Sequence, residues 1–265
     1  MPNSGQSFPV FDRPPVVETA VGVEFSPLPK WDIPAFGLYW STVRERYPEA
    51  KTQYVLGRPE VAPFLMLPPV PRCQFLDRTR SRLIQVQGDR FIYNWQRNSA
   101  DLEYPHYETL RPVFRDEWSG LQSFMEAQEI GFPEVQTCEV TYVNQIEHGV
   151  GWNDLGDLAQ VVTCWGASPL PESVSEQQVV ALNATYRMEE GEGTLTFQLH
   201  NAVRNSDGKP VLQLALSSRG RPRSSSIDDV LQWLDLGHST VVRSFAHFTT
   251  PRMHEIWKRK DDRWL

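Results

Sequence analysis

Residues 82–95 carry the clearest structural signature in this sequence, that of a β-hairpin. Two runs of alternating side chains, 82–87 and 90–95, flank the dipeptide Gly88-Asp89. A two-residue turn led by glycine is a strong hairpin signal, because glycine readily adopts the positive φ angles that such turns need. The segment therefore predicts two antiparallel strands in a chain that contains a sheet.

The remaining patterns predict helices and strands that recur in the same order in both halves of the chain. Alternation at 21–25 and 135–146 predicts one strand early in each half. Apolar residues three and four apart predict helices at 33–47 and 107–129, and a short helix is expected at 154–165. Further strands are expected at 53–56, 73–76, 179–189, 194–204 and 210–218, followed by a helical stretch at 227–260 that breaks at Pro251.

Together these elements predict an α+β protein made of two tandem units, at 18–131 and 132–265, behind an extended or disordered N-terminal arm at 1–17. Each unit reads strand, helix, three or four antiparallel strands, helix. Helices on one face of one curved antiparallel sheet, or of two adjoining sheets, would bury the apolar side of both units. This order resembles the saddle-shaped fold of TATA-binding protein and the helix-grip folds, an analogy of fold that carries no function.

The charge and the cysteine content argue against several classes of protein. The chain has 265 residues, with 26 Lys and Arg against 33 Asp and Glu, whereas proteins that coat nucleic acid or anionic membranes usually carry a basic excess. Cys73, Cys138 and Cys164 are far apart and form no CxxC pair, which argues against disulfides and structural zinc. The N-terminus has no apolar signal-peptide core, and no run approaches the ~18–20 apolar residues of a membrane span. We therefore expect a cytoplasmic protein without cofactor, metal or membrane contact.

The titratable residues predict no catalytic constellation. His238, His247 and His254 are spaced too widely for two of them to hold one ion from a single helix. The sequence contains neither a GxSxG nucleophile elbow nor a glycine-rich phosphate loop. An enzyme remains an alternative only if the fold brings a third group to His254-Glu255, or otherwise gathers a site of His, Tyr and Glu side chains.

Side chains that share a strand face provide the candidate binding surface. Large aromatic rings bury much area at a low entropic cost, which suits recognition. The candidates lie on two strands and at one strand exit: Phe91, Tyr93, Trp95, Tyr142, Asn144 and His148. The alternative is that they are structural, with Trp95 packed beneath the helix that begins near Tyr107.

Arginines form two groups with alternate spacing. Alternate residues of a strand share a face, so two converging groups could contact phosphates in spite of the acidic total. Most charge clusters are only solvated surface, and nucleic-acid binding is kept as an alternative. The two groups are Arg78, Arg80 and Arg82, and Arg219, Arg221 and Arg223.

Five short motifs spread from about residue 21 to 257 carry a family resemblance. They are Val23–Leu28 (VEFSPL), Arg90–Trp95 (RFIYNW), Tyr104–Glu108 (YPHYE), Glu139–Asn144 (EVTYVN), and Leu236-Gly237-His238 with Phe245 and Thr249. Together they resemble a sporadically distributed, functionally uncharacterised family of bacterial proteins. The resemblance implies a bacterial cytosolic protein with no established activity. Its patchy distribution is similar to that of mobile accessory genes, such as defence and toxin–antitoxin modules.

The sequence thus favours a non-enzymatic binding protein of a bacterial accessory module. It would hold a protein partner or a small ligand on a free sheet face, or in a groove between the sheet and the helices. A homo-oligomer is also compatible with this reading, because an exposed sheet edge can pair across a two-fold axis.

Overall fold

A computed structural model of the chain describes residues 7–53, 56, 71–166, 172–189 and 192–264. The chain groups into two compact units, each made of discontinuous stretches. Unit 1 comprises residues 1–17, 141–219 and 235–265, and unit 2 comprises residues 18–140 and 220–234.

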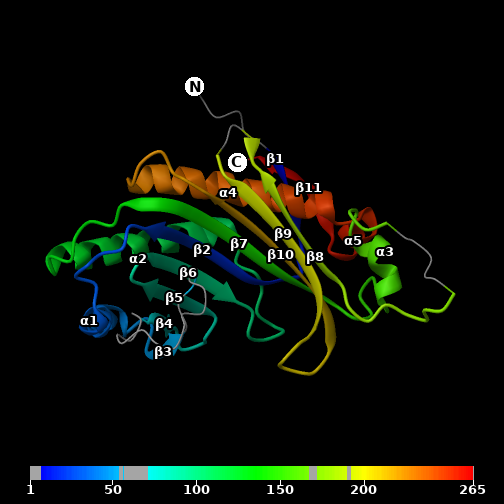
Figure 1. Cartoon of the computed structure of the whole chain (residues 1–265), viewed down its shortest axis with the longest axis horizontal. Coiled ribbons are helices and arrows are strands. Elements are labelled where there is room, and N and C mark those ends of the chain that lie inside the picture. Colours follow the sequence, from blue (N-terminus) through cyan, green and yellow to red (C-terminus); the bar gives the residue numbers. More distant parts are fainter. Residues whose placement is uncertain (1–6, 54–55, 57–70, 167–171, 190–191, 265) are drawn as a thin grey trace. The chain divides into compact units, whose positions relative to one another are not determined.

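Most of the β-structure lies in an antiparallel sheet with the strand order β3-β4-β5-β6-β2-β7-β10-β9-β8 (Figure 1). The prediction of an α+β protein with a large antiparallel sheet is therefore confirmed. The strands are β2 (Val16–Phe25), β3 (Glu49–Gln53), β4 (Arg72–Leu76), β5 (Arg82–Gln87), β6 (Arg90–Gln96), β7 (Val135–Glu147), β8 (Ala181–Arg187), β9 (Thr194–Val203) and β10 (Pro210–Gly220).

The elements follow one another in the order expected from the sequence. In the first half, β2 is followed by α1 (Ile33–Val43), strands β3 to β6 and α2 (Tyr107–Ala127). In the second half, β7 is followed by η1 (Leu155–Asp157), α3 (Leu158–Val161), strands β8 to β10 and α4 (Ile227–Phe248). Both halves therefore read strand, helix, strands, helix.

Three details differ from the sequence prediction. The last helical stretch breaks before α5 (Pro251–Ile256) as expected, but residues near 260 belong to a strand, β11 (Arg259–Trp264). This strand pairs with β1 (Ser7–Phe11), so residues 7–11 of the N-terminal arm lie in a small two-stranded sheet, and the last two residues of the arm begin β2. The strand expected at 53–56 lies earlier, at β3, and residues 54–55 are outside the described residues.

In unit 2, α1 and α2 pack on the same face of the sheet. Asp32 caps α1 by accepting a hydrogen bond from the backbone N–H of Ala35, as its position before Pro34 predicts. The ring of Tyr39 on α1 lies 6.1 Å from that of Phe75 on β4, and Trp118 on α2 lies 5.6 Å from Phe91 on β6. These rings form the core of unit 2.

An ion pair between the exposed Arg46 and the buried Glu117 connects the segment after α1 to α2 within unit 2. Arg46 donates to both carboxylate oxygens of Glu117, from Nε at 3.1 Å and from Nη2 at 2.9 Å. The hydroxyl of Tyr47 donates to Glu117 Oε1 at 3.0 Å. Burial, together with the charge of Glu117, raises the pKa of Tyr47, so the phenol keeps the proton that it donates.

In unit 1, α4 packs on one face of β7, β10 and β9, and α5 joins the small sheet. The ring of Phe248 lies 4.9 Å from that of Phe197 on β9. Phe11 on β1 meets Phe245 on α4 at 5.3 Å and Trp257 after α5 at 6.2 Å, both in edge-on geometry. These aromatic contacts connect three elements that lie far apart in the sequence.

Candidate functional site

The aromatic candidates on β6 belong to the core of unit 2. Phe91, Tyr93 and Trp95 share one strand face, as predicted, but that face is the one that α2 covers, and each side chain is at most 2% exposed. Trp95 contacts Tyr104, which precedes α2, with ring centroids 5.5 Å apart. The structure thus corrects the expectation of an exposed aromatic surface here, because the helices cover the side of the sheet that carries the largest apolar rings.

The candidates on β7 are also structural. The hydroxyl of Tyr142 lies 2.9 Å from Nδ1 of His238 on α4, and Asn144 donates from Nδ2 to the carbonyl of Leu214 at 3.2 Å. Both side chains are buried. His148 is exposed and donates from Nε2 to the carbonyl of Asn153 at 2.9 Å, so it closes a loop and does not join the other two in a pocket.

The sheet of unit 1 has a free face on the side of β8, β9 and β10 that α4 does not cover. Two cross-strand rows run over β8, β9 and β10, and their side chains are exposed or half-buried. One row is Thr185, Thr196 and Ser217, and the other is Asn183, Gln198 and Ala215. We call these six residues the open face. Alternation along a single strand tells which side chains share a face, but it gives neither the register of the rows nor the face that the helices cover.

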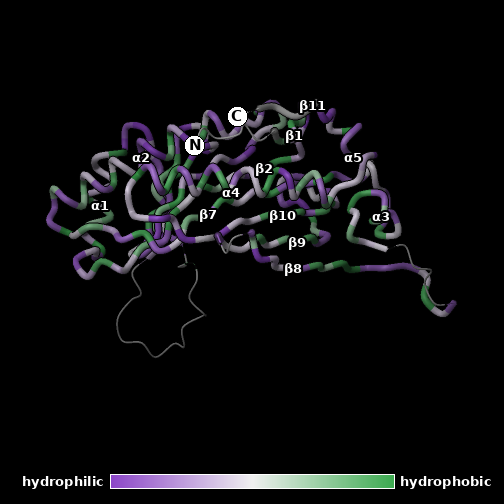
Figure 2. Tube along the Cα trace, turned by 90° about the horizontal axis from the view of Figure 1, so that it is seen from above, coloured by the Kyte–Doolittle hydropathy of each residue, from purple (hydrophilic) through white to green (hydrophobic). Residues whose placement is uncertain are grey.

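Strand β8 is an unprotected edge beside the open face. It is the last strand in the sheet order, and Figure 2 shows it as the outermost of β8, β9 and β10. Its seven residues, Ala181–Arg187, include no proline or lysine, the residues that commonly guard an edge. Such an edge can accept another strand.

The hydrogen-bonding direction of β8 follows from its pairing with β9. The backbone N–H of Met188 donates to the carbonyl of Gly193 at 2.9 Å, and Arg187 lies opposite Thr194. Hydrogen-bonded and non-hydrogen-bonded pairs alternate along an antiparallel ladder. The backbone groups of Asn183 and Thr185 therefore point away from β9, toward the free edge.

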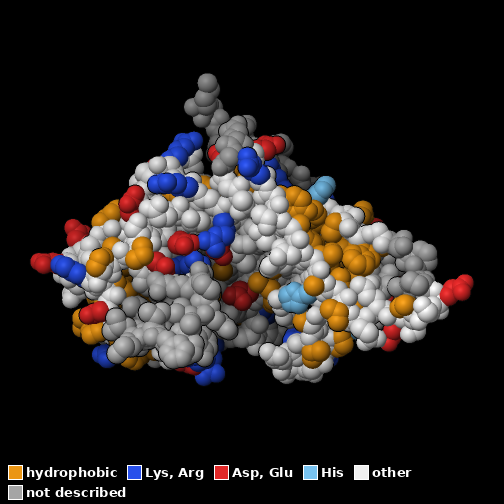
Figure 3. All heavy atoms as spheres, viewed as in Figure 1, with side chains coloured by type: hydrophobic (Ala, Val, Ile, Leu, Met, Phe, Trp, Pro, Cys, Tyr) orange, Lys and Arg blue, Asp and Glu red, His pale blue; other side chains and the backbone are white. Residues whose placement is uncertain are grey.

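An apolar patch borders this edge. Tyr186 on β8 is 43% exposed, and its ring lies 5.5 Å from that of Phe248 at the end of α4. In Figure 3, hydrophobic side chains gather where β8 passes the C-terminal part of α4. Just before β8, Val179 is 71% exposed. The edge thus offers backbone hydrogen bonds together with apolar contacts, which is what a protein segment needs for binding.

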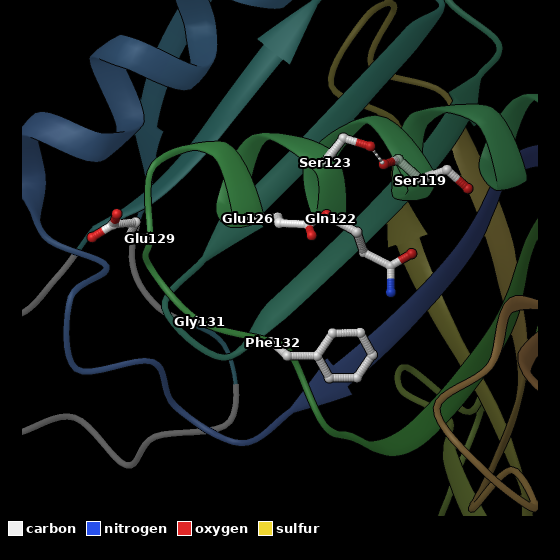
Figure 4. Close-up of a pocket in the computed structure, with 7 residues that line it drawn as sticks. All are labelled: Ser119, Gln122, Ser123, Glu126, Glu129, Gly131 and Phe132. Atoms are coloured by element: carbon white, nitrogen blue, oxygen red, sulfur yellow. Dashed lines mark hydrogen bonds between the residues drawn. The ribbon is translucent and has the colours of Figure 1, made fainter.

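A pocket of about 560 Å³ lies along the outer side of α2 in unit 2 (Figure 4). Serine, glutamine and glutamate side chains and the ring of Phe132 line it, and the lining includes no histidine, cysteine, lysine or arginine. Figure 4 shows Glu129 directed away from that ring. None of the sequence-predicted site residues lines the pocket, whose lining is Ser119, Gln122, Ser123, Glu126, Glu129, Gly131 and Phe132.

The two arginine groups are mostly exposed. Arg78, Arg80 and Arg82 lie at the surface of unit 2, and Arg80 forms an ion pair with Glu49 at 2.6 Å. Arg219 ends the unit 1 part of β10 and is half-buried, whereas Arg221 and Arg223 are exposed in unit 2. Nucleic-acid binding by these groups stays a prediction from the sequence.

The cysteines lack the environment of a reactive thiol. Burial raises the pKa of Cys138 to about 12, and desolvation also raises the pKa values of Cys73 and Cys164. Reactive cysteines need the opposite shift, because the thiolate is the nucleophile. Within the described ranges, no three His, Cys, Asp or Glu side chains are placed to hold a metal ion, and no helix is long and apolar enough to cross a membrane.

His254 is held in its neutral form within unit 1. Thr249 donates its hydroxyl proton to the carbonyl of Phe245 at 2.6 Å, so Nε2 of His254 must donate to Thr249 Oγ1 at 2.9 Å. Nδ1 then carries no proton, and it faces Nη1 of Arg259 at 3.4 Å. Desolvation, and then the charge of Arg259, lower the pKa of His254 from 6.5.

This arrangement predicts a loss of stability in acid. Because the folded-state pKa of His254 is lower than the unfolded value, the unfolded chain binds the proton first as the pH falls below 6.5. Unfolding by urea at pH 7.5 and at pH 5 should show that the wild type loses more stability than His254→Gln, whose amide can still donate to Thr249. Equal losses in the two proteins would contradict the assignment.

No family model matches this chain, and no curated protein is significantly similar to it.

Proposed function

We propose that this chain is a non-enzymatic binding protein whose strand β8 takes up an extended segment of a protein partner. The observation that carries the proposal is the free edge of β8, with the backbone groups of Asn183 and Thr185 directed outward. A partner strand would continue the sheet by main-chain hydrogen bonds, as in other cases of β-strand addition.

The surroundings of β8 support a protein segment over a small ligand. The rows of the open face carry only small or amide side chains. Tyr186 and Phe248 offer an aromatic contact to a side chain of the incoming segment. The resemblance noted from the sequence supports a bacterial accessory module as the setting, and a partner encoded by an adjacent gene would fit it.

Asn183→Pro tests the proposal directly. Proline at this position removes a backbone N–H that points to the free edge, and leaves the β8–β9 hydrogen bonds intact. In affinity purification of the tagged full chain from its native host, a protein bound by the wild type should be lost from Asn183→Pro, while the melting temperature changes little.

Asn183→Ala is the matched control, because it removes the side chain but keeps the N–H, and it should retain the partner. Sedimentation of the purified wild type, which measures its oligomeric state, provides a second test. A partner bound equally by all three proteins, or a dimer that Asn183→Pro alone abolishes, would refute the proposed role of β8 in binding another protein.

A further inference from the structure

Two arginines lie in one polar row across the sheet of unit 2. In the strand register, Gln53 lies opposite Arg72, and Gln87 and Glu24 both lie opposite Arg90. The pairing of Cys73 with Val86 places Arg72 opposite Gln87, one step further along β4 and β5. Side chains in one row share a face, so Arg72 and Arg90 project from the same side with one glutamine between them. The helices α1 and α2 pack on the opposite side, and on this side the backbone of Leu56 exchanges hydrogen bonds with the side chain of Gln87.

Arg90 is buried and Arg72 is half-buried, and both guanidinium groups are incompletely hydrogen-bonded. Arg90 is 8% exposed, and its Nη2 contacts Glu24 Oε2 at 3.0 Å. Arg72 donates from Nη1 to Gln85 Oε1 at 2.8 Å. The Nε atoms of both arginines are buried and have no hydrogen-bond partner. Folded proteins rarely leave buried N–H groups unpaired, because the desolvation of the donor is then not compensated.

A chain of side-chain amides fixes the orientation of Arg72. Because arginine can only donate, Gln85 presents its oxygen to Arg72 and donates from Nε2 to Asn94 Oδ1 at 2.6 Å. Asn94 in turn donates from Nδ2 to Glu18 Oε1 at 2.7 Å. Arg72 is therefore held by one end of its guanidinium group, and its buried Nε–H has no hydrogen-bond partner.

Charged groups of both signs surround the two arginines. Desolvation, and then the positive charge of Arg90, lower the pKa of Arg72, whereas the negative charge of Glu18 acts in the opposite direction. Desolvation raises the pKa of Glu18. Glu24 pairs with Arg90, and Asp89 accepts a hydrogen bond from Gln87 at 2.6 Å. The two arginines thus lie close enough to repel each other, although each of them also interacts with a carboxylate.

We propose that unit 2 binds a small oxyanion, a carboxylate or phosphate group, between Arg72 and Arg90. The planar guanidinium group offers N–H donors in a fork that matches both kinds of oxyanion. Such a group would accept hydrogen bonds from the two Nε–H donors that have no partner. The amide side chains around the arginines favour a small polar ligand over an apolar one. This site is separate from the strand edge of unit 1.

The first test observes the two Nε–H groups directly in the wild type. The full chain, labelled with ¹⁵N, is titrated with inorganic phosphate or with succinate, against sodium chloride at equal ionic strength. The Nε–H resonances of Arg72 and Arg90 should shift saturably with phosphate, succinate or both, which also identifies the preferred group. Resonances that stay in place, or that move equally with chloride, would overturn the proposal without reliance on any variant.

The second test compares two variants by isothermal titration with the anion that shifts these resonances. Arg72→Gln should weaken binding at least tenfold, because it removes one of the two charged donors. Arg78→Gln is the matched control, since it removes the same charge from an exposed loop position, and it should bind as the wild type does. Equal affinity in Arg72→Gln and in the wild type would refute the site.

Discussion

Trp118→Ala should lower the free energy of unfolding by about 3–5 kcal/mol, the usual cost of removing a large aromatic side chain from a core. The side chain of Trp118 is fully buried, and its ring centroid lies 5.6 Å from those of Phe25 and Phe91. Alanine would leave a cavity between α2 and the strands β2 and β6 of unit 2. Urea unfolding followed by circular dichroism measures the loss.

Trp118→Phe separates packing from polarity at the same position. The indole Nε1 of Trp118 is buried without a hydrogen-bond partner, so phenylalanine removes an unpaired donor along with part of the ring. We expect Trp118→Phe to lower the free energy of unfolding by less than half as much as Trp118→Ala does. A loss below about 1 kcal/mol in Trp118→Ala would contradict the assignment of this ring to the core.

Gly151→Ala should destabilise unit 1 by about 3 kcal/mol, since it combines backbone strain with a steric clash. The φ angle of Gly151 is +83°, a conformation that favours glycine. A Cβ atom would lie 2.9 Å from Cε of Met253 and still closer to its sulfur. The contacted atoms are the far end of a flexible side chain, but Met253 is fully buried, so this side chain can shift only against packed neighbours.

Gly149→Ala is a matched control in the same loop. Gly149 also has a φ angle of +83°, but a Cβ atom there would meet nothing within 4 Å. Gly149→Ala should therefore lower the free energy of unfolding only through backbone strain, by about 1 kcal/mol. The difference between the two variants in thermal unfolding measures the clash with Met253, and equal losses would show that this contact plays no part.

The elements that sequence periodicity predicts well are those with a long apolar pattern. The strand expected at 135–146 is β7 (Val135–Glu147), and the helix expected at 107–129 is α2 (Tyr107–Ala127). The pairing of β1 with β11 joins the two ends of the chain. No local pattern encodes such a pairing, which explains why residues near 260 looked like a continuing helix.

The candidate site could be predicted only in part, because alternation tells which side chains share a face but not what covers that face. Phe91 and Tyr93 share a face as predicted, and the helices cover it. The signal for the open face was present in the small and amide side chains of β8 to β10, whose polarity marks a face without helices. The row that contains Arg72 and Arg90 depends on the register of neighbouring strands, which a single sequence does not specify.

The helix α4 has a consequence for any attempt to dissect this protein by truncation. It begins in unit 2 and ends in unit 1. A fragment that stops after β7 would lose Val230 and Leu234, which are fully buried, and Ser225, whose hydroxyl accepts a hydrogen bond from the backbone N–H of Val135 at 2.8 Å. No single cloning boundary therefore releases either half intact. A fragment that fails to bind would show the effect of the missing helix, and it would not locate the binding site.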